Sequence, residues 1–348
     1  MIRIVSAVGA GWALAVVTTT PTSAQEAGAE FYRGKQITIL VGSAAGAGYD
    51  AYARLVSRHI GKHLPGNPDV VVQNMPGAGG LIAANHLYTR APRDGTAIGH
   101  IQGPLSIRQI AGARNVMYDM RKFGWLGSAN STSNVCALSP RVSVKTGGDL
   151  LAREIVIGGT GGSTTYVPSF LNATVGTKFK IIAGYKSTND VVIAIERGEV
   201  DGLCGWGWDS AKVSSMGFFE RGVLRVGLDV GRAPHPELSA QGVPFALDLV
   251  KDEERRDTLR FAFSYLAYIR PFVTPPELPG DRLRALQSSF EATFKDKEFL
   301  AEAEKANLEI RYVGPQAVAE ALDAVFNAPE RTKENAMVKL KEAGFEGL

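Results

Sequence analysis

The sequence predicts an α/β protein with two blocks of alternating strands and helices. Short apolar runs rich in β-branched residues recur along the chain, and several lead through a glycine-rich loop into a stretch with helical spacing of apolar residues. A polar stretch at 128–134, SANSTSN, divides the chain and has the composition of a crossing segment. Alternating strands and helices build sheets that helices cover, so we expect one α/β lobe on each side of the crossing.

The first block is predicted to hold three strands. The run at 37–41 is suited to a buried parallel strand, and the helix after it stops where Pro65-Gly66 follows. The second strand leads through NMPGAGG, residues 74–80, into another helix. The predicted strands are 37–41, 70–73 and 97–101, and the predicted helices are about 49–64 and 81–89.

The second block repeats this arrangement, and the last third of the chain is predicted to be helical. We expect Gly198 to cap a helix, GWGWDS at 205–210 to begin a loop, and the strand at 224–228 to carry the chain back toward the first block. The predicted strands are 155–157, 179–182, 200–204 and 224–228. The predicted helices are about 166–174, 190–197, 282–293, 297–306, 315–326 and 328–342.

The N-terminus has the pattern of a secretory signal peptide. Arg3 gives a positive start, residues 4–17 are almost wholly apolar, and a small-residue cleavage site ends at Ala24. The apolar run is shorter than the ~20 residues that span a bilayer. We therefore expect residues 1–24 to be removed on export. The remainder is expected to form a discontinuous first lobe, 25–134 plus 232–348, and a second lobe, 135–231.

Charge and cysteine content narrow the class of protein. The chain has 38 basic and 35 acidic residues, which argues against a nucleic-acid-binding protein because such proteins need a clustered basic face. Two cysteines are present, Cys136 and Cys204. An oxidising compartment permits a disulfide between them, and the alternative is two buried small side chains.

The loop GSAAGAGYD at 42–50 predicts an anion site. Small residues let a ligand approach the backbone closely, and the N-terminus of the following helix favours negative charge. Ser43 and Tyr49 add hydroxyl groups. Asp50 either serves the first helical turn as a cap or dipole partner or contacts a polar group of the ligand. A dinucleotide site is disfavoured because the second strand ends in Gln-Asn, without the acidic residue that binds a ribose.

The second block offers a similar loop, GGTGGSTT at 158–165. Its hydroxyl residues stand beside four glycines where a strand meets a helix. If both loops face one cleft, each end of a small diacid meets a helix N-terminus without buried counter-charges, whose desolvation is costly. The plainer alternative is a capped turn that serves only its own helix.

Three further residues are candidates for ligand contact, and each also has a possible role that does not involve a ligand. Lys186 either pairs with a ligand carboxylate or is a solvated surface lysine. Trp206 and Trp208 either wall an aromatic-ligand pocket or pack against the neighbouring domain.

Catalytic patterns are absent from the sequence. There is no Gly-x-Ser-x-Gly and no His-Glu-x-x-His. His59 and His63 share a helix face at the spacing of two metal ligands, but no third ligand is evident. We therefore expect no enzymatic activity, no cofactor and no metal.

At these loops the chain resembles the receptors of the tripartite tricarboxylate transporters, the TctC or Bug family. The likeness covers essentially the whole mature chain. It lies in YRGKQITILVGSAAGAGYDAYARLV, NMPGAGG, APRDGTAIG, GTGGSTT, the Tyr-Lys loop, GEVDG and IRPFVTPPELPGDRLRALQSSF, in this order.

The resemblance implies a periplasmic binding protein of type II topology, whose two α/β lobes close on a carboxylated small molecule. It also implies delivery of this ligand to a membrane permease, and we expect a monomer. By matching positions the resemblance assigns ligand contacts to Ser43, Ala44, Ala45, Gly46, Ala47, Gly48, Asp50, Thr160, Gly161, Gly162, Ser163, Thr164, Tyr185, Lys186 and Asp201, to which Tyr49 and Trp206 are added.

The first loop departs from the family pattern, which often reads Pro-Phe-Pro-Ala-Gly-Gly-Gly-Thr-Asp. Tyr49 stands where the family has a small hydroxyl residue, so the ligand is expected to be a di- or tricarboxylate or an aromatic carboxylate rather than a simple C4 diacid. Two other functions remain open: a secreted α/β enzyme, whose support is the strand–loop–helix layout, and a ligand sensor that presents its closed form to a signalling partner.

Overall fold

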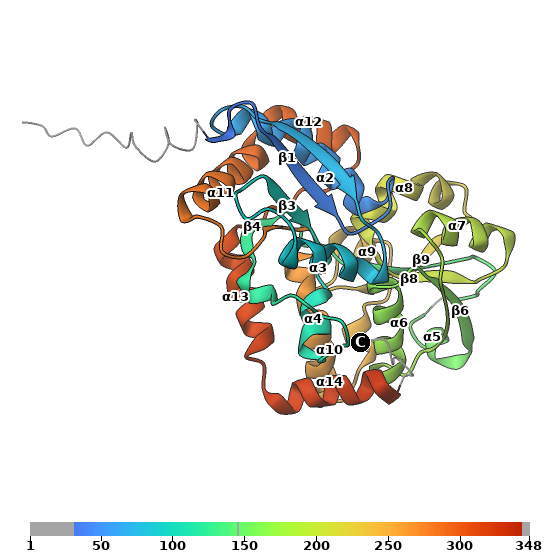
Figure 1. Ribbon diagram of the computed structural model, residues 1–348. Helices are drawn as coiled ribbons and strands as arrows, with labels where there is room; N and C mark the ends of the chain where they lie inside the picture. Colours follow the sequence, from blue (N-terminus) through green and yellow to red (C-terminus); the bar gives the residue numbers. More distant parts are fainter. Residues whose placement is uncertain (1–30, 145, 343–348) are drawn as a thin grey trace, which may run out of the picture.

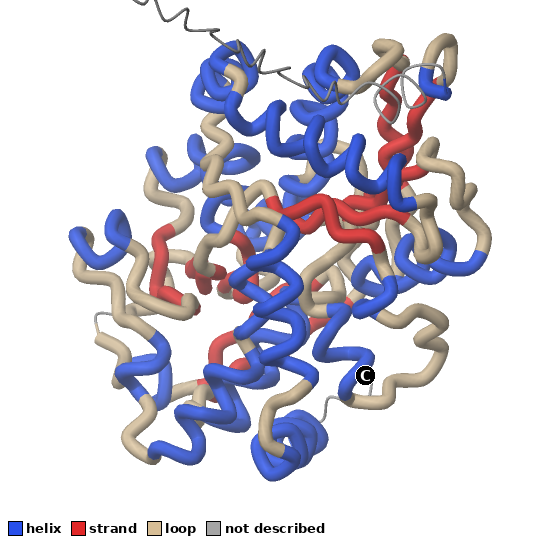
Figure 2. Tube along the Cα trace, turned by 90° about the vertical axis from the view of Figure 1, so that its left-hand side faces the viewer, coloured by secondary structure: helices blue, strands red, loops and turns tan. Residues whose placement is uncertain are grey.

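The computed structural model describes residues 31–144 and 146–342, which form two lobes, each built around a five-stranded sheet (Figure 1). The expected signal peptide, 1–24, lies outside the described residues. Strands gather inside each lobe and helices surround them (Figure 2). Among the described residues, no helix has the length and apolar character needed to cross a bilayer.

The first-lobe sheet combines parallel strands with one inserted antiparallel strand. Its order is β2 (Asp69–Asn74), β1 (Gln36–Val41), β3 (Ala97–His100), β10 (Pro271–Thr274) and β4 (Gly124–Ser128). β1 pairs in parallel with β2 and β3, whereas β10 is antiparallel to both β3 and β4. Helices of this lobe are α2 (Gly48–Ile60), α3 (Leu81–Thr89), α4 (Leu105–Ile110), α11 (Gly280–Lys295), α12 (Lys297–Lys305) and α13 (Pro315–Phe326).

The second-lobe sheet has the same plan. Its order is β7 (Lys178–Ala183), β6 (Glu154–Gly159), β8 (Gly202–Gly207), β5 (Asn134–Leu138) and β9 (Arg225–Val230). β6 is parallel to β7 and β8, and β5 is antiparallel to β8 and β9. In both sheets the antiparallel strand is the one that arrives from the other lobe. The helices here are α5 (Asp149–Ala152), α6 (Ser163–Thr174), α7 (Thr188–Arg197) and α8 (Trp208–Glu220).

Most predicted elements are confirmed, and the predicted crossing at 128–134 connects β4 to β5. The loop predicted at 205–210 is wrong, because β8 continues to Gly207 and α8 begins at Trp208. Every residue of β8 is buried, so its glycines pack inside the sheet and do not interrupt it. The strand predicted at 224–228 is present as β9, but it does not carry the chain back to the first lobe. It is the edge strand of the second sheet.

The segment after β9 packs against the second lobe. The carbonyl of Pro244 accepts a hydrogen bond from the Asp229 N–H at 2.9 Å, and Trp208 Nε1 donates to Glu237 at 2.9 Å. This segment includes α9 (Pro236–Ala240) and a short 3-10 helix, Ala246–Leu249. We therefore propose that the second lobe extends to near residue 250, beyond the boundary expected at 231.

The C-terminal helix connects the two lobes. α14 (Glu330–Glu342) follows α13 but packs against α6 and against α10 (Glu253–Ala262). In Figure 1 it runs along the lower edge of the molecule in red. The first lobe is thus held to the second by a packed helix as well as by the crossing segments.

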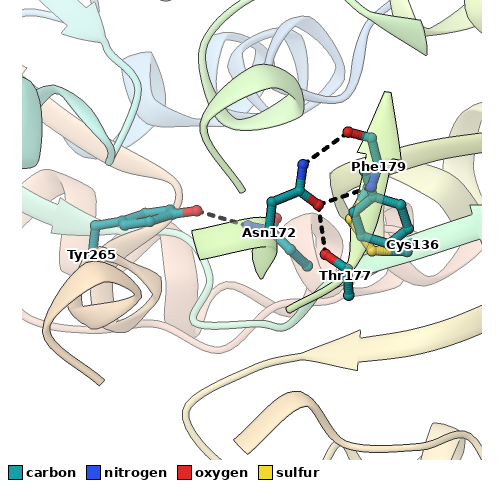
Figure 3. The surroundings of a disulfide bond; sticks show 7 residues. Cys136, Asn172, Thr177, Phe179 and Tyr265 are labelled. Atoms are coloured by element: carbon teal, nitrogen blue, oxygen red, sulfur yellow. Dashed lines mark hydrogen bonds between the residues drawn. A yellow bond between two sulfur atoms is a disulfide. The ribbon is translucent and has the colours of Figure 1, made fainter. Parts of the chain in front are cut away.

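A disulfide joins Cys136 of β5 to Cys204 of β8, which face each other in the strand register. Its surroundings include Asn172, whose side-chain carbonyl accepts from the Thr177 hydroxyl at 2.7 Å and from the Phe179 N–H at 2.8 Å (Figure 3). The bond lies in the core of the second lobe, since both cysteines are fully buried.

Candidate functional site

A cavity of about 110 Å³ lies between the two lobes. The loops after β1 and β2 wall it on one side, and the loops after β6 and β7 together with the end of β8 wall it on the other. Both glycine-rich loops singled out in the sequence therefore face the same space. The predicted site residues that line it are Ser43, Ala44, Ala47, Gly48, Tyr49, Thr160, Gly161, Ser163, Thr164, Lys186 and Trp206.

Two helix N-termini, one from each lobe, meet this cavity without side-chain caps. The N-cap of α2 is Ala47 and that of α6 is Gly162, and neither makes a side-chain capping hydrogen bond. The first backbone N–H groups of a helix have no partner within the helix, and the helix dipole adds positive potential there. The backbone N–H groups at the N-termini of α2 and α6 can therefore donate hydrogen bonds to an anion.

Two buried polar atoms lie at the cavity wall without partners. The hydroxyl of Ser43 and the side-chain oxygen of Asn134 make no hydrogen bond among the described residues, and both residues line the cavity. Buried polar groups are nearly always hydrogen-bonded in native proteins. Both atoms are therefore expected to bind a ligand or an ordered water.

A buried ion pair crosses from one lobe to the other at the floor of the cavity. Arg270 precedes β10 of the first sheet, and Asp209 is in the first turn of α8. Nε of Arg270 donates to one carboxylate oxygen at 2.8 Å and Nη2 donates to the other at 2.7 Å, and their side chains are 2% and 0% exposed. Burial alone raises the pKa of Asp209, but the charge and hydrogen bonds of Arg270 outweigh it and hold the pKa below its ordinary value.

One nitrogen of the Arg270 guanidinium takes no part in the pair with Asp209. Nε and Nη2 bind the carboxylate and Nη2 also donates to the Ser210 hydroxyl, which leaves Nη1 outside these contacts. The group lies over the ring of Tyr49 with its central carbon 4.3 Å from the ring centre. Arg270 also lines the cavity.

Tyr49 is fixed by packing and by a hydrogen bond. Its hydroxyl donates to the carbonyl of Ile269 at 2.7 Å, and its ring lies 4.8 Å from that of His100. The His100 ring stacks on Phe272 at 4.1 Å and its Nδ1 bonds the Pro271 carbonyl. Tyr49 therefore shapes one wall and is not a mobile arm of the site.

His100 predicts a dependence of stability on pH. Burial lowers its pKa from 6.5 to about 3, so the unfolded chain takes up a proton below pH 6.5 while folded His100 stays neutral. Stability is then lost as the pH falls from 6.5 toward 3, by at most ~1.4 kcal/mol per pH unit from this residue. We expect His100→Gln to flatten this slope in urea unfolding measured between pH 7 and 4. An unchanged slope would contradict the assignment.

The two lobes touch through glycines, so the structure is a closed form. A Cβ added to Gly79 of the first lobe would lie 2.6 Å from the backbone nitrogen of Gly162 in the second. A Cβ added to Gly48 would overlap the Ser210 side chain of α8. These approaches leave no room for larger residues while the cleft is shut.

Some predicted residues lie beside the cavity and not in its wall. Asp50 has the structural role: it accepts from the Gly46 N–H and from Arg54, both at 2.8 Å. Ala45, Gly46, Gly162 and Tyr185 are next to lining residues but are not among them.

Asp201 lies away from the cleft, at the opposite end of β8. Its carboxylate accepts the N–H of Val156 at 2.9 Å, so it joins two strands of the sheet. The structure therefore gives it no contact with the cavity.

Several lining residues are not among the predicted ligand contacts. Gln102, Asn134, Ser210, Tyr265 and Arg270 come from five separate segments, and where one lies in a string quoted above, that string carries no ligand role for it. The NMPGAGG loop was visible as a glycine-rich turn, and it supplies Pro76, Gly77, Gly79 and Gly80 to the wall.

The structure also brings carboxylates to the predicted histidine pair. His59 bonds Glu302 at 2.6 Å and His63 bonds Asp296 at 2.9 Å, and Glu298 lies nearby. Cationic side chains already occupy these carboxylates: Lys62 pairs with Asp296 and Glu298, and Arg58 pairs with Glu302. The cluster is therefore a network of ion pairs between α2 and α12.

Comparison with known proteins identifies the fold. No family model and no curated protein matches the chain. Among solved structures, the malate-bound MatC of Rhodopseudomonas palustris is similar with a TM-score of 0.66 and 15% identity, over 88% of this chain and 99% of that one. The fold is that of a periplasmic binding protein.

Two further solved structures are similar over 87% and 90% of this chain. The periplasmic binding protein BugD has a TM-score of 0.65 and 19% identity, over 90% of this chain and 99% of its own. R. palustris Rpa4515 with adipate has a TM-score of 0.65 and 17% identity, over 87% and 97%. The expected two-lobed periplasmic-binding-protein architecture, with its cleft between α/β lobes, is thereby confirmed.

Proposed function

We propose that the protein is a periplasmic solute receptor of the TctC or Bug type that captures a small carboxylate between its lobes. The observation that carries the proposal is the convergence of two uncapped helix N-termini, of α2 and α6, on one cavity between the lobes. Each end supplies backbone donors for one carboxylate. Arg270 Nη1, Lys186 and the Ser43 hydroxyl add donors from side chains.

The size of the cavity favours a short ligand. A single water needs about 10–15 Å³ of volume measured in this way, so a cavity of about 110 Å³ has room for a small organic acid. A short dicarboxylate and a single-ring aromatic carboxylate are acids of this kind. Malate and adipate, which the fold neighbours hold, belong to this size class.

A binding role explains the lining better than catalysis does. The lining residues include no His, Cys, Asp or Glu among those the structure describes, so the serine and threonine hydroxyls of the wall have no histidine or carboxylate beside them in the wall to act as a general base. We therefore propose that the protein binds its ligand unchanged and, as a monomer, passes it to a membrane permease. A ligand sensor would use the same cleft. A pull-down with the closed protein distinguishes a membrane permease from a signalling partner.

The test is a panel of di-, tri- and aromatic carboxylates measured by thermal shift and isothermal titration. We expect saturable one-to-one binding of at least one of them. Ser43→Ala should weaken it about tenfold or more, because a hydrogen bond to a charged group contributes roughly 1.5–3 kcal/mol. Ser57→Ala on the exposed face of α2 is the control and should bind like the unmodified protein. A folded sample that binds none of the panel contradicts the proposal.

A further inference from the structure

A second cavity, of about 180 Å³, lies where the chain crosses between the lobes. It is lined by 131–133 of the crossing from β4 to β5, by 232–236 after β9, by Leu266 and Ala267, and by Arg311. None of these residues lines the cleft between the lobes. This hinge cavity is therefore separate from the candidate ligand site, and its occupancy does not depend on the proposed function.

The floor of the hinge cavity holds polar atoms that lack partners. The Thr132 hydroxyl and both ring nitrogens of His235 make no hydrogen bond among the described residues. Thr132 is 6% exposed and His235 is 5% exposed, so bulk water does not satisfy them. Buried groups of this kind require an occupant with hydrogen-bonding atoms.

The mouth of the cavity carries positive charge. Arg232 is exposed and makes no ion pair or hydrogen bond among the described residues. Arg311 pairs with Glu309 at 2.6 Å, and the other oxygen of Glu309 lies 3.7 Å from His235 Nε2 and 3.9 Å from the ammonium of Lys212. A second carboxylate, that of Asp229, lies behind the floor and accepts the His235 backbone N–H at 2.7 Å. Neither Glu309 nor Asp229 forms an ion pair with Arg232 in the described part of the chain.

We infer that the hinge cavity binds a small oxyanion, such as phosphate, sulfate or the carboxylate of a small acid. The planar guanidinium of Arg232 matches two oxygens of such a group, while the Thr132 hydroxyl and the His235 ring donate to the buried oxygens. A metal cation is disfavoured by the two arginines, and an apolar group would leave the floor unsatisfied. Water alone would satisfy the floor but leave Arg232 without a counter-charge.

The position of the site gives the anion a structural consequence. The cavity is lined by both passages of the chain between the lobes, by 131–133 before β5 and by Leu266 and Ala267 before β10. An anion held there links segments whose relative movement accompanies opening and closing. Its effect on ligand affinity in the cleft must be reciprocal, because coupled binding equilibria shift each other by the same factor.

The test is titration of inorganic phosphate into the mature protein, in a buffer free of phosphate and sulfate. We expect saturable binding that Arg232→Gln and Thr132→Val each weaken about tenfold or more, as expected for a charge-assisted hydrogen bond. Arg153→Gln, which removes an equally exposed charge from the second lobe, should leave phosphate binding unchanged. Arg232 has no partner to lose, so its variant is expected to fold normally even if Thr132→Val does not.

Two results would overturn the inference. The first is the absence of saturable phosphate binding. The second is phosphate binding that Ser43→Ala weakens and Arg232→Gln does not, which would place the anion in the cleft. Binding in the cleft is measured separately with the carboxylate panel. A negative result for the hinge cavity can therefore be told apart from a negative result for the cleft.

Discussion

Replacement of Arg270 by methionine is expected to lower the free energy of unfolding by about 3–5 kcal/mol. The change leaves the fully buried carboxylate of Asp209 without its counter-charge and removes two hydrogen bonds of 2.7 and 2.8 Å. Arg270 and Asp209 come from different lobes, so the substitution weakens the contact between the lobes. Equilibrium unfolding in urea, followed by tryptophan fluorescence, measures it.

Two controls distinguish the effect of leaving the Asp209 charge buried from the effect of lost packing in Arg270→Met. Arg121→Met removes a half-exposed arginine that pairs with Asp119, and ion pairs open to solvent are worth about 0–1 kcal/mol. The double variant Arg270→Met, Asp209→Leu removes both charges and should recover part of the lost stability. If Arg270→Met costs no more than Arg121→Met, the inter-lobe pair does not stabilise the fold.

Replacement of Gly79 by alanine is expected to abolish closure while leaving each lobe folded. The added Cβ would lie 2.6 and 2.7 Å from backbone atoms of Gly162 across the cleft, and backbone cannot move aside as a side chain can. We expect carboxylate affinity to fall at least ~100-fold, equivalent to about 3 kcal/mol. Isothermal titration measures the affinity, and small-angle scattering with and without ligand measures closure.

Gly112→Ala is the matched control for this substitution. Gly112 has a φ of +65° against +64° for Gly79, and an added Cβ meets nothing within 4 Å. Both variants therefore carry the same backbone strain of about 1–2 kcal/mol, but only one obstructs the other lobe. Equal ligand affinity in the two variants would show that the lobes need not approach as closely as in this structure.

The local chemistry of the site was predictable from sequence because it is contained in continuous strings. A strand, a glycine-rich loop and a helix determine one another through backbone geometry, and the loops at 42–50 and 158–165 line the cavity as expected. We propose a longer second lobe than the sequence indicates because the segment near Pro244 covers β9, and nothing in its composition indicates which sheet it will cover.

The long-range contacts of the site were not predictable in this way. Arg270 and Asp209 are 61 residues apart, and each taken alone is an ordinary charged residue. Their role arises because β10 is inserted beside β4 while α8 follows β8 into the cleft. Asp201 shows the opposite error: a family likeness placed it at the ligand, although its strand end lies away from the cavity.

The shared strand order of the two sheets has an electrostatic consequence. The positive ends of α2 in the first lobe and α6 in the second face the same gap, so closing an empty cleft brings two like partial charges together. An ionised ligand removes this repulsion, whereas an amide or ester of the same shape fills the space without neutralising it. For the proposed carboxylate receptor we therefore expect closure to depend on whether the ligand is ionised, so that an acid is bound in preference to its neutral analogue of the same shape.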